Sequence, residues 1–447
     1  MCKATKLSEI DNAVKFDLPV DPSHPFFVDF SKVRGDFEEE VVYKSLNVDT
    51  NNFTFDPGIN NLNKTLLFIS GMRGSGKTSE LNKYAAKLDK PDCFFCVTCN
   101  IDTDLNLNDV EYMDILIFQL QKLVEKANDK GLELDNRIIE SLQNWFTEKV
   151  VEINNRLKAE GSSEIEMTAG IPSIFSFFGF TNKLKAAISG TKERSTQVRN
   201  TLKNNFTEFA NKFNEFIEEV NLELRKKNIA REILFIIDGL EKAMSVDVRR
   251  RIILDESNRF QRIKANTIFT LPIELMKEQE YLKQFSQVVS FPFVKIRERN
   301  GNFIPEAIET FKEFVYKRID KSLFEDETTV ERAIKFGGGS PRELLRILQY
   351  ANYSISGTAG IIDKNALDKG IKRLAGESAK YITEEEINKL MLIKKNISEN
   401  KETLFDNVLQ GMIEKLIVFE YNDGTYKRVN PVIEESNLYK QYVIDAN

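Results

Sequence analysis

The stretch Thr65-Leu-Leu-Phe-Ile-Ser70-Gly71-Met-Arg-Gly74-Ser75-Gly76-Lys77-Thr78 determines the fold of this chain. Its first part, Thr65–Ser70, is short, continuous and apolar, which is typical of a strand buried on both faces of a parallel sheet. The strand ends at a glycine, and we expect a helix from Lys77 to about Leu88. A buried strand, a glycine-rich turn and a helix start in this order indicate an α/β domain with a parallel sheet.

The glycine-rich turn has the spacing of a phosphate-binding loop. Its glycines let the backbone curl until the N–H groups face phosphates, while Lys77 reaches the β- and γ-phosphates and the Thr78 hydroxyl ligates magnesium. The helix that follows adds its positive end. A purely structural turn is the alternative, but the flanking strand and helix favour a nucleotide site. We therefore expect ATP and Mg²⁺ as cofactors, held by Gly71, Gly74, Ser75, Gly76, Lys77, Thr78 and Ser79.

A second motif places acids after another apolar strand. Ile233–Ile237 is followed by Asp238-Gly239-Leu240-Glu241. Ligands of such sheets bind at the carboxyl ends of the strands, so we expect Asp238 to hold the magnesium ion together with Thr78. Glu241 is the candidate base for the attacking water. The alternatives are a turn residue for Asp238 and a solvated acid at a helix start for Glu241.

Three further strands are expected, at Cys93–Asn100, Thr267–Leu271 and Val288–Val294, with a helix around Glu274–Gln284 before the last. Thr270 ends its strand, where a polar side chain would contact the γ-phosphate or the water. A threonine that only ends a strand is about as plausible.

Arg342 is the candidate that senses the γ-phosphate. It lies in Gly337-Gly-Gly-Ser340-Pro341-Arg342-Glu343, where Ser340 fits an N-cap and Glu343 its partner in a capping box. A cation in the first turn of a helix is disfavoured by the dipole, so a compensating anion is needed. A surface arginine is the alternative.

Composition limits the class of protein. The chain has 447 residues, a net charge of −6 and a pI of about 5.4, which argues against a protein whose main task is to coat nucleic acid. No apolar run approaches the roughly 20 residues that a membrane helix needs. The first residues, MCKATKLSEIDNAVKFDL, do not fit a secretory signal, so we expect a cytoplasmic protein.

Three cysteines, Cys93, Cys96 and Cys99, suggest zinc at first sight. Steps of three residues in a strand alternate between the faces of a sheet, and the only histidine is His24. Structural zinc needs four converging ligands, so buried cysteines in a reducing compartment are the better interpretation.

The pattern predicts four parts. Residues 1–25 form a loose arm, and 26–300 form the ATPase domain, with a helical insertion over about 105–230. Helices dominate 301–380, and 381–447 combines helices with a hairpin, as in a winged helix. The hairpin signal is Asn422-Asp423-Gly424 between Val418–Tyr421 and Tyr426–Val429. Within the insertion, we expect Asp109 to cap one helix, Asp135 to cap another, and one long helix over Glu193–Lys227. The apolar residues of 161–190 are expected in a core or an interface.

These motifs resemble the AAA+ superfamily of P-loop ATPases, especially its STAND branch. Asp238-Gly239-Leu240-Glu241 is similar to the NACHT magnesium motif, where a small residue follows the aspartate and the acid comes later. Gly-Ser-Pro-Arg342 resembles the sensor-2 motif of a helical lid, which origin-recognition ATPases share. The chain departs from the generic AAA+ pattern at Gly239, where glutamate is usual, and from the NACHT pattern at Lys242. The resemblance implies the sheet order 5-1-4-3-2, with a nucleotide between sheet and lid.

Three functions remain open. The first is an ATP-driven switch that oligomerises or acts on a separate effector protein and resets by slow or partner-stimulated hydrolysis, by analogy in prokaryotic signalling or antiviral defence. The second is a DNA-associated ATPase similar to origin-recognition or transposition helpers, which the acidity disfavours. The third is a scaffold that binds nucleotide without hydrolysing it. No membrane partner is expected.

Overall fold

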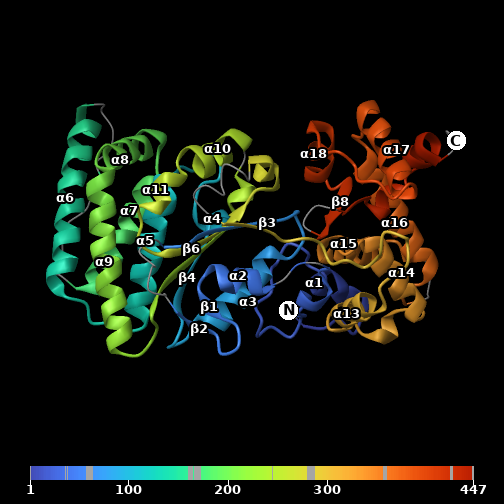
Figure 1. The fold of residues 1–447 in the computed structure, drawn as a ribbon, viewed down its shortest axis with the longest axis horizontal. Helices are drawn as coiled ribbons and strands as arrows, with labels where there is room; N and C mark the ends of the chain where they lie inside the picture. The colour runs from blue at the N-terminus through green and yellow to red at the C-terminus, as the bar shows by residue number, and fades with distance from the viewer. Residues whose placement is uncertain are drawn as a thin grey trace. The chain divides into compact units, whose positions relative to one another are not determined.

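The computed structural model describes residues 2–35, 37, 39–56, 64–159, 165, 173–243, 245–278, 287–355, 360–422 and 426–444 (Figure 1). The chain forms two compact units. Unit 1 consists of Met1–Glu39, Ser70–Lys83 and Ser290–Asn447, and unit 2 consists of Glu40–Ile69 and Tyr84–Val289. Within the described residues, none of the helices is long and apolar enough to cross a membrane.

A five-stranded parallel sheet is the centre of the α/β fold. Its strands are β3 (Leu66–Ser70), β4 (Phe94–Asn100), β5 (Glu232–Asp238), β6 (Asn266–Leu271) and β7 (Gln287–Ser290), in the order β4-β5-β6-β3-β7. Numbered along the chain and read from the other edge, this is the expected order 5-1-4-3-2. Every residue of β3 and β6 is buried, which explains their continuous apolar runs.

Strand β7 is shorter than predicted. The expected strand extends to Val294, but β7 ends at Ser290. The Phe291 N–H still donates to Ser70 O (2.5 Å), and Pro292 then follows without an N–H. Beyond it, the Val294 N–H donates to Gly339 O (3.1 Å) instead of to a strand. The helix expected around Glu274–Gln284 is a 3-10 helix, η5 (Ile273–Glu278), and its remaining residues lie outside the described part of the chain.

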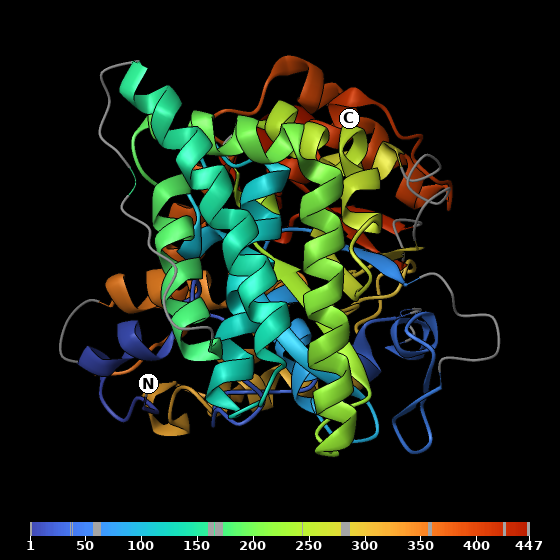
Figure 2. The same ribbon diagram turned by 90° about the vertical axis from the view of Figure 1, so that its left-hand side faces the viewer.

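A helical insertion in unit 2 covers α5 (Tyr112–Asp129), α6 (Asn136–Ala159), α7 (Ile174–Ile188), α8 (Lys192–Asn204) and α9 (Phe206–Lys226), which run side by side in teal to green in Figure 2. The single helix expected over Glu193–Lys227 is wrong. Asn205 breaks it with a φ of −109° and a ψ of 25°, and its side-chain amide donates to Thr201 O (2.8 Å). A side chain that bonds the backbone in this way competes with the helical ladder.

Two expectations about this insertion concern its caps and its aromatic residues. The residue before α5 is Glu111, whereas Asp109 pairs with Arg199 (2.6 Å). Asp135 precedes α6 as predicted, and its carboxylate accepts from the Arg137 N–H (2.8 Å). The aromatic residues Phe177 and Phe180 of the segment 161–190 are buried in the core of unit 2, although most residues of 160–172 lie outside the described part.

Unit 1 contains helices that follow the sheet in the chain. They are η6 (Lys321–Leu323), α13 (Pro305–Tyr316), α14 (Glu327–Gly337), α15 (Pro341–Tyr353) and α16 (Lys364–Ala379). The loose arm expected at residues 1–25 is instead packed on them. Ala4, Ile10, Ala13 and Val14 are buried in the core that these helices share. The elements there, η1 (Leu7–Glu9) and α1 (Ile10–Ala13), are too short to show a period in the sequence.

The C-terminal part of unit 1 contains the predicted hairpin. Strands β8 (Val418–Tyr421) and β9 (Tyr426–Val429) pair antiparallel, while Asp423 and Gly424 of the turn lie outside the described residues. The surrounding elements are α17 (Glu384–Ser398), α18 (Asn407–Glu414), α19 (Pro431–Glu434), α20 (Asn437–Tyr439) and η8 (Lys440–Ile444).

The remaining elements are α3, a helix of twelve residues, and several short helices and strands. They are η2 (Ser31–Val33), α2 (Glu39–Ser45), α3 (Lys77–Leu88), the strands β1 (Val48–Asp49) and β2 (Thr54–Phe55), α4 (Ile101–Asp104), η3 (Leu240–Lys242), α10 (Val246–Arg250), the π-helical η4 (Arg251–Asp255) and α11 (Ser257–Gln261). Of these, α3 begins at Lys77, as the sequence predicts.

Candidate nucleotide site

The loop between β3 and α3 has the backbone of a phosphate cradle. Gly74 and Gly76 have φ values of +86° and +94°, the left-handed region that favours glycine. Gly71 is required for a different reason, because a Cβ there would lie 2.3 Å from Phe291 O. All three glycines that the sequence singles out therefore have a conformational or a spatial cause.

Polar groups of this loop fit an anion. Lys77 is buried, and its Nζ donates to Gly71 O (2.7 Å) and Met72 O (3.1 Å), so its charge lies over the loop. Among the described residues, the buried Ser75 Oγ has no hydrogen-bond partner. Thr78 and Ser79 occupy the first turn of α3 and are half-buried, and the Ser79 Oγ accepts from the Val20 N–H (3.2 Å). The donors, the hydroxyls and the helix N-terminus suit phosphate with magnesium.

Arg342 lies at the start of α15, close to this loop within unit 1. A Cβ on Gly74 would come within 2.8 Å of the Arg342 Cβ, and Ser340 Oγ lies 3.4 Å from Gly74 O. Ser340 caps α15 by accepting from the Glu343 N–H (3.3 Å). The expected capping box is incomplete, because the Glu343 carboxylate accepts from Arg346 (2.8 Å) rather than from the Ser340 N–H.

The anion that compensates Arg342 in this structure is Asp17, from the N-terminal segment. The two side chains form an ion pair, and the guanidinium carbon lies 5.2 Å from the centre of the Phe16 ring. Burial lowers the pKa of Arg342, and the neighbouring Arg73 lowers it further. Arg342 is thus half-buried, with 19% of its side chain exposed, and it pairs with a carboxylate of the chain itself, whereas its contact with a γ-phosphate stays a prediction.

A second group of predicted residues comes together within unit 2. Asp238 ends β5 and is buried. The Gly239 N–H donates to Thr270 Oγ1 (3.2 Å), and that hydroxyl donates to Glu241 Oε2 (3.0 Å). The buried Thr270 side chain therefore links the backbone directly after Asp238 to the Glu241 carboxylate.

Gly239 has a structural reason to replace an acid. Its φ is +94°, and a Cβ would lie 3.1 Å from both Asn100 Oδ1 and the Asp102 backbone nitrogen. A glutamate directly after Asp238 would be strained and crowded here. The departure from the generic AAA+ pattern thus follows from the geometry of this turn.

Asn100 and Asp102 were not predicted from the sequence. Asn100 pairs with Asp238 in the register of β4 and β5, and Asp102 forms an ion pair with Lys242. The signal for Asn100 is that it ends a buried strand with a polar side chain, as Asp238 does. In a parallel sheet such ends meet at one edge.

The sheet order brings Asp238 and Thr270 to the same edge. Strand β3, which leads into the phosphate loop, lies next to β6, and β6 lies next to β5. Within unit 2, Asp238 and Thr270 therefore lie at the carboxyl ends of two adjacent parallel strands, β5 and β6. This is the edge at which doubly wound sheets bind their ligands.

The cysteines of β4 lie in the core. Cys93, Cys96 and Cys99 are buried, and burial raises the pKa of Cys93 to about 11 and also raises the pKa values of the other two. Thiols held neutral in this way behave as small apolar side chains.

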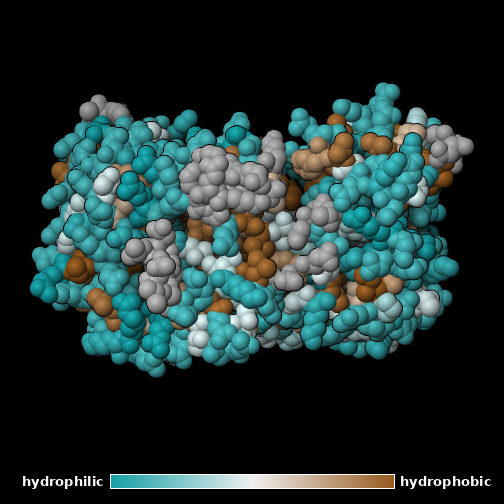
Figure 3. Space-filling view, in the orientation of Figure 1, coloured by the Kyte–Doolittle hydropathy of each residue, from teal (hydrophilic) through white to brown (hydrophobic). Residues whose placement is uncertain are grey.

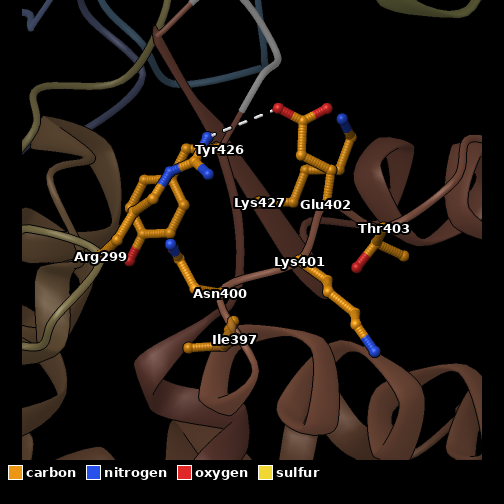
Figure 4. Close-up of a pocket in the computed structure, with 8 residues that line it drawn as sticks. All are labelled: Arg299, Ile397, Asn400, Lys401, Glu402, Thr403, Tyr426 and Lys427. Carbon is orange, nitrogen blue, oxygen red and sulfur yellow. Dashed lines mark ion pairs between the residues drawn. The ribbon is translucent and has the colours of Figure 1, made fainter.

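Figure 4 shows a pocket elsewhere in unit 1, beside the β8–β9 hairpin. The Arg299 side chain points toward Glu402, with which it pairs (3.7 Å), and Lys401 points away and pairs with Glu399 (2.6 Å). Lys427 pairs with Glu420 (3.5 Å). Each of these three cations is thus balanced by an acid.

No protein-family model matches this chain, and no curated relative matches it. Among solved structures, it is similar to the crystal structure of Cdc6p from Pyrobaculum aerophilum. The two chains are 11% identical, the match covers 98% of each, and the TM-score is 0.35. A similarity at this level supports no argument about function, so the fold class rests on the order and direction of the strands.

Proposed function

We propose that this chain is a P-loop ATPase that binds ATP with Mg²⁺ and hydrolyses it slowly as a molecular switch. The observation that carries the proposal is the loop Gly71–Thr78, with two left-handed glycines and a buried lysine after a buried parallel strand. Backbone of this shape at a helix N-terminus is suited to the β- and γ-phosphates of a nucleotide.

Magnesium would be held by the Thr78 hydroxyl and the Asp238 carboxylate. When bound, the ion would neutralise charge on the phosphates. Side chains of the chain itself would bind the phosphate and accept the proton. Lys77 would contact the transferred phosphate, and Glu241 would accept the proton of the attacking water. The Thr270 hydroxyl would keep the Glu241 carboxylate oriented (3.0 Å).

Arg342 would distinguish ATP from ADP. In the structure its guanidinium binds Asp17, an intramolecular carboxylate. A γ-phosphate would compete for the same guanidinium, because Arg342 lies against the phosphate loop. ATP would then release the segment around Asp17, and hydrolysis would let it return. This exchange is the switch, and a second copy or a separate effector protein would sense it.

A phosphate-release assay tests the catalytic part of the proposal. Wild-type protein with Mg-ATP is expected to release phosphate slowly, and Glu241→Gln is expected to lower the rate by about a hundredfold or more while binding ATP normally, because an amide does not accept a proton. Glu278→Gln, a change of the same kind at η5 that is not part of the proposed site, is the control.

Three results would change this assignment. Normal turnover by Glu241→Gln would place the base elsewhere. ATP binding by the wild-type chain without any phosphate release would favour the non-hydrolysing scaffold. Strong stimulation by duplex DNA would promote the DNA-associated alternative, for which the paired cations of the hairpin offer little support.

A further inference from the structure

Arg34 is a buried arginine between the phosphate loop and the segment that follows β7. Only 2% of the residue is exposed. Its Nη2 donates to Ser75 O (3.0 Å), and its Nη1 donates to Pro292 O (2.8 Å). The guanidinium carbon lies 3.9 Å from the centre of the Phe291 ring. One side chain thus fixes a carbonyl of the loop, a carbonyl of a distant segment and an aromatic ring.

The contact with Ser75 O determines the direction of a loop N–H. A peptide group is planar and trans, so its carbonyl and its N–H point to opposite sides. Because Arg34 holds Ser75 O, the Gly76 N–H of the same peptide group points away from the guanidinium. Gly76 lies close to this contact, because a Cβ there would be 3.4 Å from Arg34 Nη2. Inward N–H groups are what a phosphate cradle requires.

Arg34 is itself held firmly. The Phe291 N–H beneath it donates to Ser70 O (2.5 Å), and the Val33 carbonyl accepts from the Lys295 N–H (3.1 Å). The next residue, Gly35, has a φ of +71°, and a Cβ there would lie 2.2 Å from Asn422 Oδ1. These contacts anchor the backbone on both sides of Arg34 and the aromatic residue on which its guanidinium stacks.

We propose that Arg34 is a positioning residue for the phosphate loop. It keeps the Ser75–Gly76 peptide turned so that its N–H faces the β-phosphate, and it thereby sets the affinity for ATP and ADP alike. The proposal rests on the function proposed above. It differs from the role of Arg342, which acts on the γ-phosphate alone. Arg34 lies outside the loop motif, so neither its spacing nor its residue type identifies it in the sequence.

The experiment is a fluorescence titration of the full-length chain with labelled ATP and ADP in the presence of Mg²⁺. We expect Arg34→Ala to weaken both nucleotides by about tenfold or more and by the same factor, since a hydrogen bond from a charged donor is lost. Millimolar guanidinium chloride should restore much of the binding, because the free ion fits the space of the missing side chain. Arg34→Lys, which retains the charge and reaches one carbonyl, should lose less.

Arg318→Ala is the matched control. Arg318 is also buried in unit 1, donates from Nη1 to Phe26 O (2.9 Å) and Phe314 O (3.0 Å), and stacks on Phe314 (3.7 Å). We expect its removal to lower the melting temperature while the folded protein binds nucleotide normally and does not respond to guanidinium.

The outcomes distinguish failure of the Arg34 proposal from failure of the proposed ATP binding. Any of three results would overturn the role of Arg34. They are wild-type affinity in both Arg34 variants, loss of ATP binding alone, and an equal loss of affinity in Arg318→Ala. If Arg34→Ala does not fold, the Arg34→Lys titration decides by the same criteria. Failure of the wild-type chain to bind either nucleotide would overturn the proposed function, and with it this inference.

Discussion

At the scale of single residues, the structure shows the contacts of side chains that the sequence identifies only as candidates. Asp238, Glu241 and Thr270 were predicted because they follow apolar strands, and the structure joins Thr270 to Glu241 by a hydrogen bond. Arg34 could not be predicted, because its partners, Ser75 and Pro292, are carbonyl groups brought to it by the fold. Backbone carbonyls carry no signal in a sequence.

The Asp17–Arg342 pair leads to a prediction at this scale. If the γ-phosphate competes with Asp17 for the guanidinium, Asp17→Asn removes the competitor. The Asp17 side chain is 65% exposed, so the pair is partly solvated and its removal has a modest effect. We expect ATP affinity to rise by about two- to fivefold with ADP affinity unchanged. Parallel calorimetric titrations with the two nucleotides measure the ratio.

Asp21→Asn is the control for this prediction. Asp21 lies in the same segment, but its carboxylate accepts from the Ser23 N–H (2.9 Å) and Ser23 Oγ (2.7 Å). It should leave the ATP-to-ADP ratio unchanged. A shift of equal size for both nucleotides in Asp17→Asn would show that the N-terminal segment affects the loop by another route.

At the scale of elements, the buried strands were predictable and the irregular segments were not. Strands β3, β5 and β6 are nearly uniform apolar runs, and their order agrees with the expected one. Strand β7 ended early because the backbone beyond it bonds to other segments. The break at Asn205 depends on one side-chain bond, and a helical period continues across it. The hydrophobic period of a sequence indicates which face of a helix is buried. It does not reveal where a side-chain hydrogen bond interrupts the helix.

The turn before α15 permits a test of one element. Gly339 has a φ of +85°, and a Cβ there would lie 1.9 Å from Val294 O. We expect Gly339→Ala to lower the free energy of unfolding by about 2 kcal/mol or more, from backbone strain and from this clash. Gly376→Ala is the control, because a Cβ at that position in α16 meets nothing within 4 Å.

Chemical denaturation measures both variants. Gly376→Ala should raise the free energy of unfolding by up to about 1 kcal/mol, since alanine favours a helix more than glycine does. Equal stability of Gly339→Ala and the wild-type chain would mean that the glycine turn tolerates a side chain, and that the approach of Val294 is not fixed.

At the scale of the whole molecule, charge and exposed surface favour a protein partner over DNA. The net charge is −6, and residues 381–447 contain twelve acids and eight bases. The same part carries exposed apolar side chains, and Figure 3 shows apolar areas on an otherwise hydrophilic surface. They are Tyr381, Leu392, Leu404, Phe405, Tyr442 and Ile444. Exposed apolar area of this kind is more typical of protein contacts than of phosphate contacts.

We therefore expect the full chain to bind duplex DNA more weakly than about 10⁻⁴ M at physiological salt, the weak end of non-specific binding. Fluorescence anisotropy with a labelled duplex, at two salt concentrations, measures this. Lys427→Glu with Arg428→Glu should change nothing, because these hairpin cations already pair with Glu420 and the Tyr426 hydroxyl. Tight binding that weakens steeply with added salt would restore the DNA-associated alternative.

The central claim is that the loop Gly71–Thr78 binds the phosphates of ATP, and equilibrium binding of labelled Mg-ATP tests it most directly. The comparison is between wild-type protein, Lys77→Ala and Lys87→Ala, which changes a lysine of the same helix outside the loop. We predict binding by the wild-type chain and by Lys87→Ala, and a loss of about a hundredfold or more in Lys77→Ala with its fold intact by circular dichroism. Binding of ATP by folded Lys77→Ala at wild-type affinity would contradict the account.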